Sequence, residues 1–407
     1  SYAEIPADAQ ANYMFPYMYP MPETYDYAKE DLPCYPTSVG FSSLATVMTD
    51  NLQAAVDAGA EVRYSTKGVE LILNDEGAVA GIYAQAAGSD GYLKITAPSV
   101  ILATGDYLGN EDMMKFYAPE CVENGINILS IDLDDEGNYT NVGEGHKMGA
   151  WAGAAIEQWH APMIHHMGGG AGADGRGVIG NNGYLWLNLR GKRFMNEATW
   201  VQGKCLGVMY NGGSDHAWSI FDANWQNDLK SSLEHGGGMF WDTFRPYGSD
   251  YQVAVDGHPK TVENGIAETP DYYKRADTLE ELAEMIEVDP AELKATVERY
   301  NKLCKEGEDK DFYKENHFLF PVEEGPFTAC MVAPGLLAVC GGIHISDNFE
   351  VLNENDEPIP GLYAIGNCAG DIYAVDYPIN IQGNSHGRCL VQGKCLGEQL
   401  AGVYQEI

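Results

Sequence analysis

The chain has 407 residues, which is enough for a large hydrophobic core and more than one domain. Its formal net charge of −36 at pH 7 argues against binding to nucleic acid or to an anionic membrane surface, because both depend on basic residues. No apolar run has the length of a membrane span. The nine cysteines are scattered without a Cys-x-x-Cys pair, so we predict no zinc, iron–sulfur or other metal site.

The N-terminal third predicts a loop, a helix and a series of strands. Residues 1–36 are rich in Tyr, Met and Pro and are typical of loops. Residues 41–60 predict a helix, because apolar side chains recur there at helical spacing, and a strand is expected to start at 61–65. Four further strands, bounded by glycine turns, are expected at 69–73, 79–85, 92–96 and 100–103.

The middle of the chain predicts a mixed α+β segment. A helix is expected within 143–154. Two later helices have clear start signals: 278–286 opens with the capping box of Thr278 and Glu281, and 290–304 opens with Asp289 followed by proline.

Two apolar runs end in glycine and predict a ligand-binding edge. The first ends in Ala103-Thr104-Gly105, and the second, about 260 residues later, leads into Gly366 and Asn367. Glycine lets the backbone approach a ligand closely, and Asn367 offers an amide beside that approach. Each run alone could be a core strand followed by an ordinary turn. Together they indicate two contacts with one dinucleotide.

These and other motifs resemble the flavoprotein family of fumarate reductase, succinate dehydrogenase and 3-ketosteroid dehydrogenase. The similar segments are 100–110, 143–148, 188–197, 278–301 and 341–387. The resemblance implies an α/β fold, with a doubly wound, Rossmann-like flavin domain interrupted by an α+β cap domain. It assigns 1–154 and 338–407 to the flavin domain and 155–337 to the cap. It also implies FAD, bound non-covalently because no histidine lies in the family's attachment context.

The glycine-rich unit that should open such a domain is not evident. The literal Gly-x-Gly-x-x-Gly match at 170–175 follows no apolar strand, and we interpret it as a loop, like the adjoining His165-His166. We expect the N-terminal unit to be removed, disordered or supplied by a second chain. The dispersed thiols favour a reducing or anaerobic setting, and both a cytoplasmic and an exported location stay open.

The family resemblance also implies which residues contact FAD. They are Gly68 and Val69 at the adenine; Ala103, Thr104 and Gly105 at the diphosphate; Gly366 and Asn367 at the ribityl chain; and Gly383, Asn384 and Ser385 at the pyrimidine edge. His386, at the expected helix start, could tune the flavin or simply cap the helix.

The substrate positions depart from those of fumarate reductase. Trp200 stands where that subfamily has its proton-donating arginine, and Leu337 and Ala338 replace its polar substrate contacts. The later arginine is also missing, since 379–382 is uncharged. A dicarboxylate needs cationic partners, so the sequence argues against a fumarate-like substrate.

Three residues are candidates for contact with a ketone substrate. Tyr377, followed by Pro378, resembles the ketosteroid branch's Tyr-Pro motif, whose phenol polarises a carbonyl. Two extra residues lie between Tyr377 and Ser385, so it could instead be a packed aromatic side chain. Tyr19 loosely resembles the upstream tyrosine of that branch. His160 resembles a substrate-facing histidine and is the best candidate for proton transfer.

The sequence therefore leaves three functions open. The first is an FAD enzyme that reduces or forms a C=C bond conjugated to a carbonyl, in a bulky apolar or aromatic substrate such as a 3-oxosteroid or aryl enone. The second is a fumarate- or urocanate-type reductase of small carboxylates, with its cations rebuilt from Arg176, Arg190 or Arg193. The third is a non-catalytic electron-transfer subunit. A separate electron donor is expected in each case.

Overall fold

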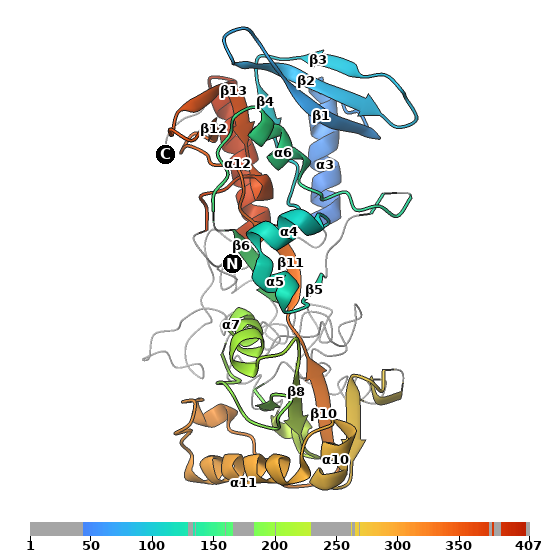
Figure 1. The fold of residues 1–407 in the computed structure, drawn as a ribbon, viewed down its shortest axis with the longest axis vertical. Coiled ribbons are helices and arrows are strands. Elements are labelled where there is room, and N and C mark those ends of the chain that lie inside the picture. Colours follow the sequence, from blue (N-terminus) through green and yellow to red (C-terminus); the bar gives the residue numbers. More distant parts are fainter. Residues whose placement is uncertain are drawn as a thin grey trace.

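The protein is represented by a computed structural model. The structure describes residues 44–128, 133–134, 136–158, 160–165, 183–199, 201–228, 262, 265–267, 269–373, 377 and 384–403. Figure 1 shows the described elements in two lobes along the long axis, with a short sheet and two helices between them. Within the described part of the chain, no helix combines the length and apolar composition needed to cross a bilayer.

The upper lobe begins with a helix and an antiparallel sheet (Figure 1). Helix α3 spans Leu44–Asp57, and β1 (Thr66–Leu73), β2 (Val79–Ala86) and β3 (Leu93–Thr96) pair in that order. The strand expected at 61–65 is wrong. Ser65 has a φ of +49°, a left-handed turn conformation that starts β1 one residue later.

The second sheet of the upper lobe joins segments far apart in the sequence. Its order is β12 (Glu350–Leu352), β13 (Pro358–Ala364) and β4 (Val100–Leu102). β13 runs parallel to β4, with Leu362 opposite Val100 and Ala364 opposite Leu102. The pairing buries Leu102, Leu362 and Ala364 in one core cluster. The two glycine-ended runs of the sequence are therefore neighbouring strands.

Helices cover this sheet and extend the lobe. α6 spans Glu144–Trp151 and packs against β1, and α12 spans Asn384–Leu400. The short helices α4 (Glu111–Tyr117) and α5 (Pro119–Glu123) lead to the middle sheet. That sheet has the order β5 (Asn127–Ile128), β11 (Gly335–Cys340) and β6 (Ala161–His165). His165 therefore ends a strand rather than lying in a loop; His166 and 170–175 are outside the described residues.

The lower lobe is an antiparallel sheet backed by helices. Its strands follow the order β7 (Leu185–Leu187), β8 (Ala217–Phe221), β10 (Phe327–Val332) and β9 (Tyr273–Ala276). Its helical elements are α7 (Val201–Leu206), the π-helix η4 (Gly207–Gly212), α10 (Leu279–Met285), α11 (Pro290–Glu306) and the 3₁₀ turn η5 (Asn316–Phe318).

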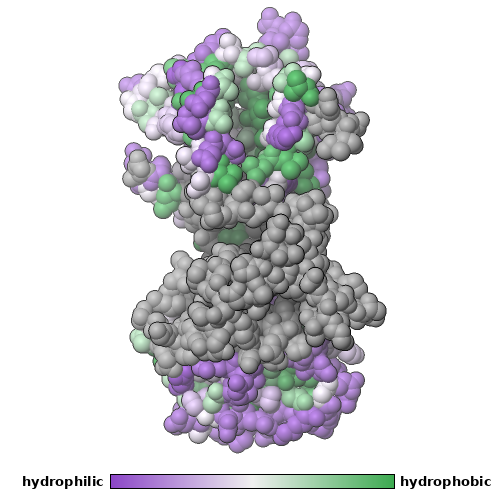
Figure 2. Space-filling view, turned by 180° about the vertical axis from the view of Figure 1, so that it is seen from behind, coloured by the Kyte–Doolittle hydropathy of each residue, from purple (hydrophilic) through white to green (hydrophobic). Residues whose placement is uncertain are grey.

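The helices α10 and α11 of the lower lobe begin at the capping residues that the sequence predicted. The side chain of Thr278 accepts from the backbone N–H of Glu281 at the start of α10, and Asp289 caps α11 in the same way. Figure 2 shows a mainly hydrophilic surface at this end of the molecule, over α10 and α11. The division into a flavin domain and a cap at 154/155 and 337/338 stays a prediction.

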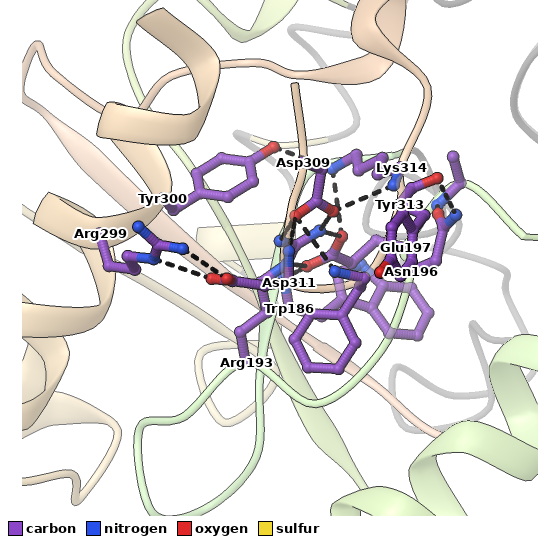
Figure 3. Close-up of polar contacts among 12 residues, drawn as sticks. Trp186, Arg193, Asn196, Glu197, Arg299, Tyr300, Asp309, Asp311, Tyr313 and Lys314 are labelled. Atoms are coloured by element: carbon purple, nitrogen blue, oxygen red, sulfur yellow. Dashed lines mark hydrogen bonds and ion pairs between the residues drawn. The ribbon is translucent and has the colours of Figure 1, made fainter. Parts of the chain in front are cut away.

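A buried ion network holds the lower lobe together (Figure 3). The guanidinium of Arg193 donates to both oxygens of Glu197, with two distances of 2.7 Å, and to both oxygens of Asp309, at 2.9 and 2.6 Å. Lys314 lies 3.3 Å from Glu197 and donates to the hydroxyl of Tyr300 at 2.8 Å. Because the side chains of Glu197 and Asp309 are fully buried, each charge depends on its partners.

Replacing Arg193 with Met should lower the free energy of unfolding by about 3–5 kcal/mol, because two buried carboxylates lose their shared cation. Urea unfolding of the purified variant measures this loss. The matched control is Arg299→Met, which breaks the solvent-exposed pair with Asp311 at 2.5 Å and should change the urea midpoint little. Equal midpoints for the two variants would show that the network contributes no more than a surface pair.

Candidate functional site

The candidate site begins where two parallel strands end. β4 is followed by Gly105 with a φ of +74°, and β13 is followed by Gly366 with a φ of +67°. A side chain is strained in this left-handed region, so glycine turns the backbone sharply at both positions. The carboxyl edge of neighbouring parallel strands is the usual ligand crevice of open α/β sheets. The structure thus brings together the two edges that the sequence singled out.

Helix α6 closes one side of this edge. A Cβ built at Gly145 would overlap Thr104 Oγ1, which follows β4, and would lie 2.9 Å from Cys368 Sγ, which follows β13. Only glycine therefore lets α6 approach both strand ends. Gly68 and Val69, predicted to lie at the adenine, are in β1, which packs against α6. Ala103 and Thr104 are exposed at the edge itself.

Helix α12 closes the opposite side. The backbone N–H of Gly366 donates to the buried side-chain oxygen of Gln392 at 2.8 Å, which ties the helix to the glycine turn. The first two residues of α12, Asn384 and Ser385, are half-buried near this edge, and their contact with the pyrimidine stays a prediction. His386 is exposed, and Gly383 lies outside the described residues.

Tyr377 lies at the start of α12. Its hydroxyl accepts the backbone N–H of Ser385 at 2.7 Å, and its ring meets Tyr373 edge-on with centroids 5.2 Å apart. The side chain is buried in the cluster that also contains Ala338 and Cys340 of β11, with Leu337 packed against it. Burial raises the pKa of the phenol well above its ordinary value, so the hydroxyl keeps its proton.

Three polar side chains converge on Asn367. Its side-chain oxygen accepts from Arg388 Nη2 at 2.5 Å, and lies 3.5 Å from Ser385 Oγ and 3.6 Å from Cys340 Sγ. All three of these contacts are with its side-chain oxygen and none is with its side-chain nitrogen. Sequence reasoning missed Arg388, although it is the sole arginine after Arg299.

Two acidic side chains, which sequence reasoning also missed, hold the backbone of β11 and of residues that follow it. Asp106 accepts the N–H of Val339 in β11 at 3.2 Å. Glu157 accepts the N–H of Gly342 at 2.8 Å and that of Asp371 at 2.7 Å, and burial raises its pKa to about 7. Their roles depend on contacts with residues about 200 positions away, which no local pattern signals.

His160 is held by two protein partners. Its Nε2 lies 3.1 Å from the carbonyl oxygen of Glu157, which can only accept, so Nε2 carries the proton. Burial lowers the pKa of the imidazole to about 4, so the ring is neutral and Nδ1 accepts from the hydroxyl of Tyr107 at 2.5 Å. The ring also stacks on Tyr117. Proton transfer to a substrate would require one of these hydrogen bonds to break.

The other predicted substrate and cation positions are either outside the described residues or away from this edge. Tyr19, Trp200 and Arg176 lie outside the described residues. Arg190 is exposed, and Arg193 is fully engaged in the buried network of the lower lobe. Across the described segments, no group of three His, Cys, Asp or Glu side chains is placed to hold a metal ion.

The polar atoms at this edge suit a ligand rich in hydrogen-bond acceptors. Nε and Nη1 of Arg388 and the hydroxyl of Tyr373 are buried without a hydrogen-bond partner in the part of the chain that the structure describes. Buried donors are normally satisfied, so a bound group is expected to complete them. The carbonyl and ribityl oxygens of a flavin have the required chemistry, and the two glycine turns leave bare backbone for the rest of the dinucleotide.

Comparisons with known proteins identify the family of the chain. The chain matches the family model described as FAD binding domain over residues 34–380. It is 28% identical over 367 residues to the vinyl phenol reductase of Lactiplantibacillus plantarum, covering 87% of this chain and 71% of that protein. It is 28% identical over 356 residues to a fumarate reductase (cytochrome) of Shewanella frigidimarina, covering 87% and 54%.

A solved structure shows the same fold. It is the 3-ketosteroid-Δ4-(5α)-dehydrogenase of Rhodococcus jostii RHA1 in complex with 4-androstene-3,17-dione, with a TM-score of 0.61 and 23% identity, covering 88% of this chain and 62% of that one. The predicted α/β flavin-binding fold is thereby confirmed. This chain spans about half to 71% of the length of the two curated relatives. With its glycine-ended parallel strands and a family match over most of its length, the chain belongs to the FAD binding domain family.

Proposed function

We propose that the protein is an FAD-dependent oxidoreductase acting on a C=C bond conjugated to a carbonyl, in a bulky apolar or aromatic substrate. FAD, bound non-covalently, would supply the hydride acceptor or donor at N5. The observation that carries the proposal is the position of Tyr377. Its protonated hydroxyl lies at the start of α12, and its side chain belongs to the apolar cluster that contains Ala338 and against which Leu337 packs.

Tyr377 would orient and polarise the substrate carbonyl. Its oxygen already accepts the N–H of Ser385, so its own proton is free to be donated. A neutral phenol with a raised pKa can stabilise negative charge that develops on a carbonyl oxygen without itself losing the proton. The apolar surroundings strengthen this hydrogen bond, because little water competes for it.

The names of the relatives support an unsaturated substrate, but the substrates that they name differ in polarity. One is named as a vinyl phenol reductase, which favours an aromatic substrate, and another as a fumarate reductase, which favours a small carboxylate. The second reading needs cations, and Arg193 is already paired with Glu197 and Asp309. A separate electron donor completes the proposal, as does an N-terminal dinucleotide-binding unit from the same protein or a second chain.

Reoxidation of the reduced flavoprotein separates these readings. The full-length protein is reduced anaerobically and mixed with fumarate or with an aryl enone, and the return of flavin absorbance is followed. Reoxidation by the enone supports the proposal. Turnover with fumarate alone would overturn it, and no reaction with any unsaturated acceptor would indicate an electron-transfer subunit.

Replacing Asn367 with Leu should weaken FAD binding by on the order of 1–3 kcal/mol, because a ribityl hydroxyl loses its partner. Fluorescence titration of the apoprotein with FAD measures the change. Asn367→Asp is the informative companion, since it keeps an oxygen for Arg388 but removes the amide donor. Wild-type affinity in both variants would show that the amide does not contact the cofactor.

Replacing Tyr377 with Phe should lower kcat by roughly 10²–10³-fold, as expected for removing a single donor to a developing oxyanion. The substrate KM should change less, because the hydrogen bond strengthens as charge develops. Steady-state enone reduction gives both values, and FAD content should be retained. Tyr363→Phe in β13, where the ring is half-buried, is the matched control. A wild-type rate for Tyr377→Phe would make Tyr377 a packing residue.

A further inference from the structure

Arg388 occupies an electrostatically unfavourable place. It is the fifth residue of α12 and lies near the positive end of the helix dipole, where acidic side chains are favoured and basic ones are not. The chain has a net charge of −36, so carboxylates that could pair with the Arg388 cation are abundant. Within the described ranges, however, Arg388 makes no ion pair, and its one hydrogen bond to a side-chain oxygen is with the neutral Asn367.

The surroundings hold this cation in one position. Nη2 donates to Asn367 Oδ1 at 2.5 Å, and the guanidinium carbon lies 5.1 Å from the centre of the Tyr373 ring, in a cation–π contact. Two of its nitrogens, Nε and Nη1, are buried without a partner in the described part of the protein. A guanidinium that is oriented but only partly satisfied is arranged for a ligand that accepts hydrogen bonds.

The position of Arg388 indicates which part of a ligand it meets. Asn367 follows the glycine turn of β13, Ser385 lies one helical turn before Arg388, and Tyr377 receives the N–H of Ser385. By the family resemblance, Asn367 lies at the ribityl chain of FAD and Ser385 at its pyrimidine edge. The dinucleotide's diphosphate is assigned to the other strand end, at Thr104 and Gly105.

We propose that Arg388 is a fixed positive charge against the pyrimidine side of bound FAD, where it favours the negatively charged reduced flavin over the neutral oxidised one. A cation there adds to the dipole of α12, so the two together make the flavin easier to reduce. This inference rests on the FAD binding of the proposed function but does not depend on the identity of the substrate.

The test compares the affinity of one apoprotein for two forms of the cofactor. Apoprotein of the full-length protein is titrated anaerobically with oxidised FAD and with chemically reduced FAD, and the ratio of the two Kd values is calculated. In Arg388→Gln, which keeps a hydrogen-bonding side chain but no charge, the preference for reduced FAD should fall about tenfold, the size expected for one partly buried charge. This corresponds to a midpoint potential lower by about 30 mV for two electrons.

Two further variants make the result specific. Arg388→Lys keeps the charge and should keep most of the wild-type ratio. Lys394→Gln removes an exposed cation from the same helix, paired with Glu398 at 2.6 Å, and should leave both Kd values unchanged.

Equal weakening of both FAD forms in Arg388→Gln would overturn the proposal, because a structural role would not distinguish them. An unchanged ratio would overturn it as well. Failure of the wild-type protein to bind either form would instead refute the FAD site itself.

Discussion

The parallel pairing of β4 with β13 is the constraint on which the site depends. It joins segments 100–102 and 358–364, so two glycine turns that are far apart in the sequence open at one edge. The helices are then positioned by these strand ends: α6 approaches them through Gly145, and α12 is tied to them through Gln392. The edge presents backbone and a few polar side chains, which is what a long, polar dinucleotide requires.

A second constraint is the apolar strand β11, which lies next to this edge. It lies between β5 and β6 and buries Val339 and Cys340 completely or nearly so. Its backbone is held by the carboxylate of Asp106, and the glycine that follows it is held by Glu157. Acidic side chains therefore hold the backbone here, while the cluster that contains Tyr377 stays apolar.

The sequence predicted the elements whose signals are local. Helices α10 and α11 were placed by their capping residues, and β1 to β4 by short apolar runs between turns. The expected strand at 61–65 failed because a positive φ at Ser65 interrupts it. Arg388 and Glu157 could not be predicted in the same way. Glu157 acts across 185 and 214 positions of sequence, and the importance of Arg388 is visible only once its unsatisfied nitrogens are seen.

The side chain of Glu157 holds the backbone at two separate points. Both acceptor oxygens bind backbone beside the flavin edge, and the neighbouring residues Ala155 and Ile156 also pair with 352 and 343. The chain is thus anchored to the upper lobe up to residue 157. The carbonyl oxygen of Glu157 also accepts from His160 Nε2, so this one residue couples the backbone at the edge to the position of the imidazole.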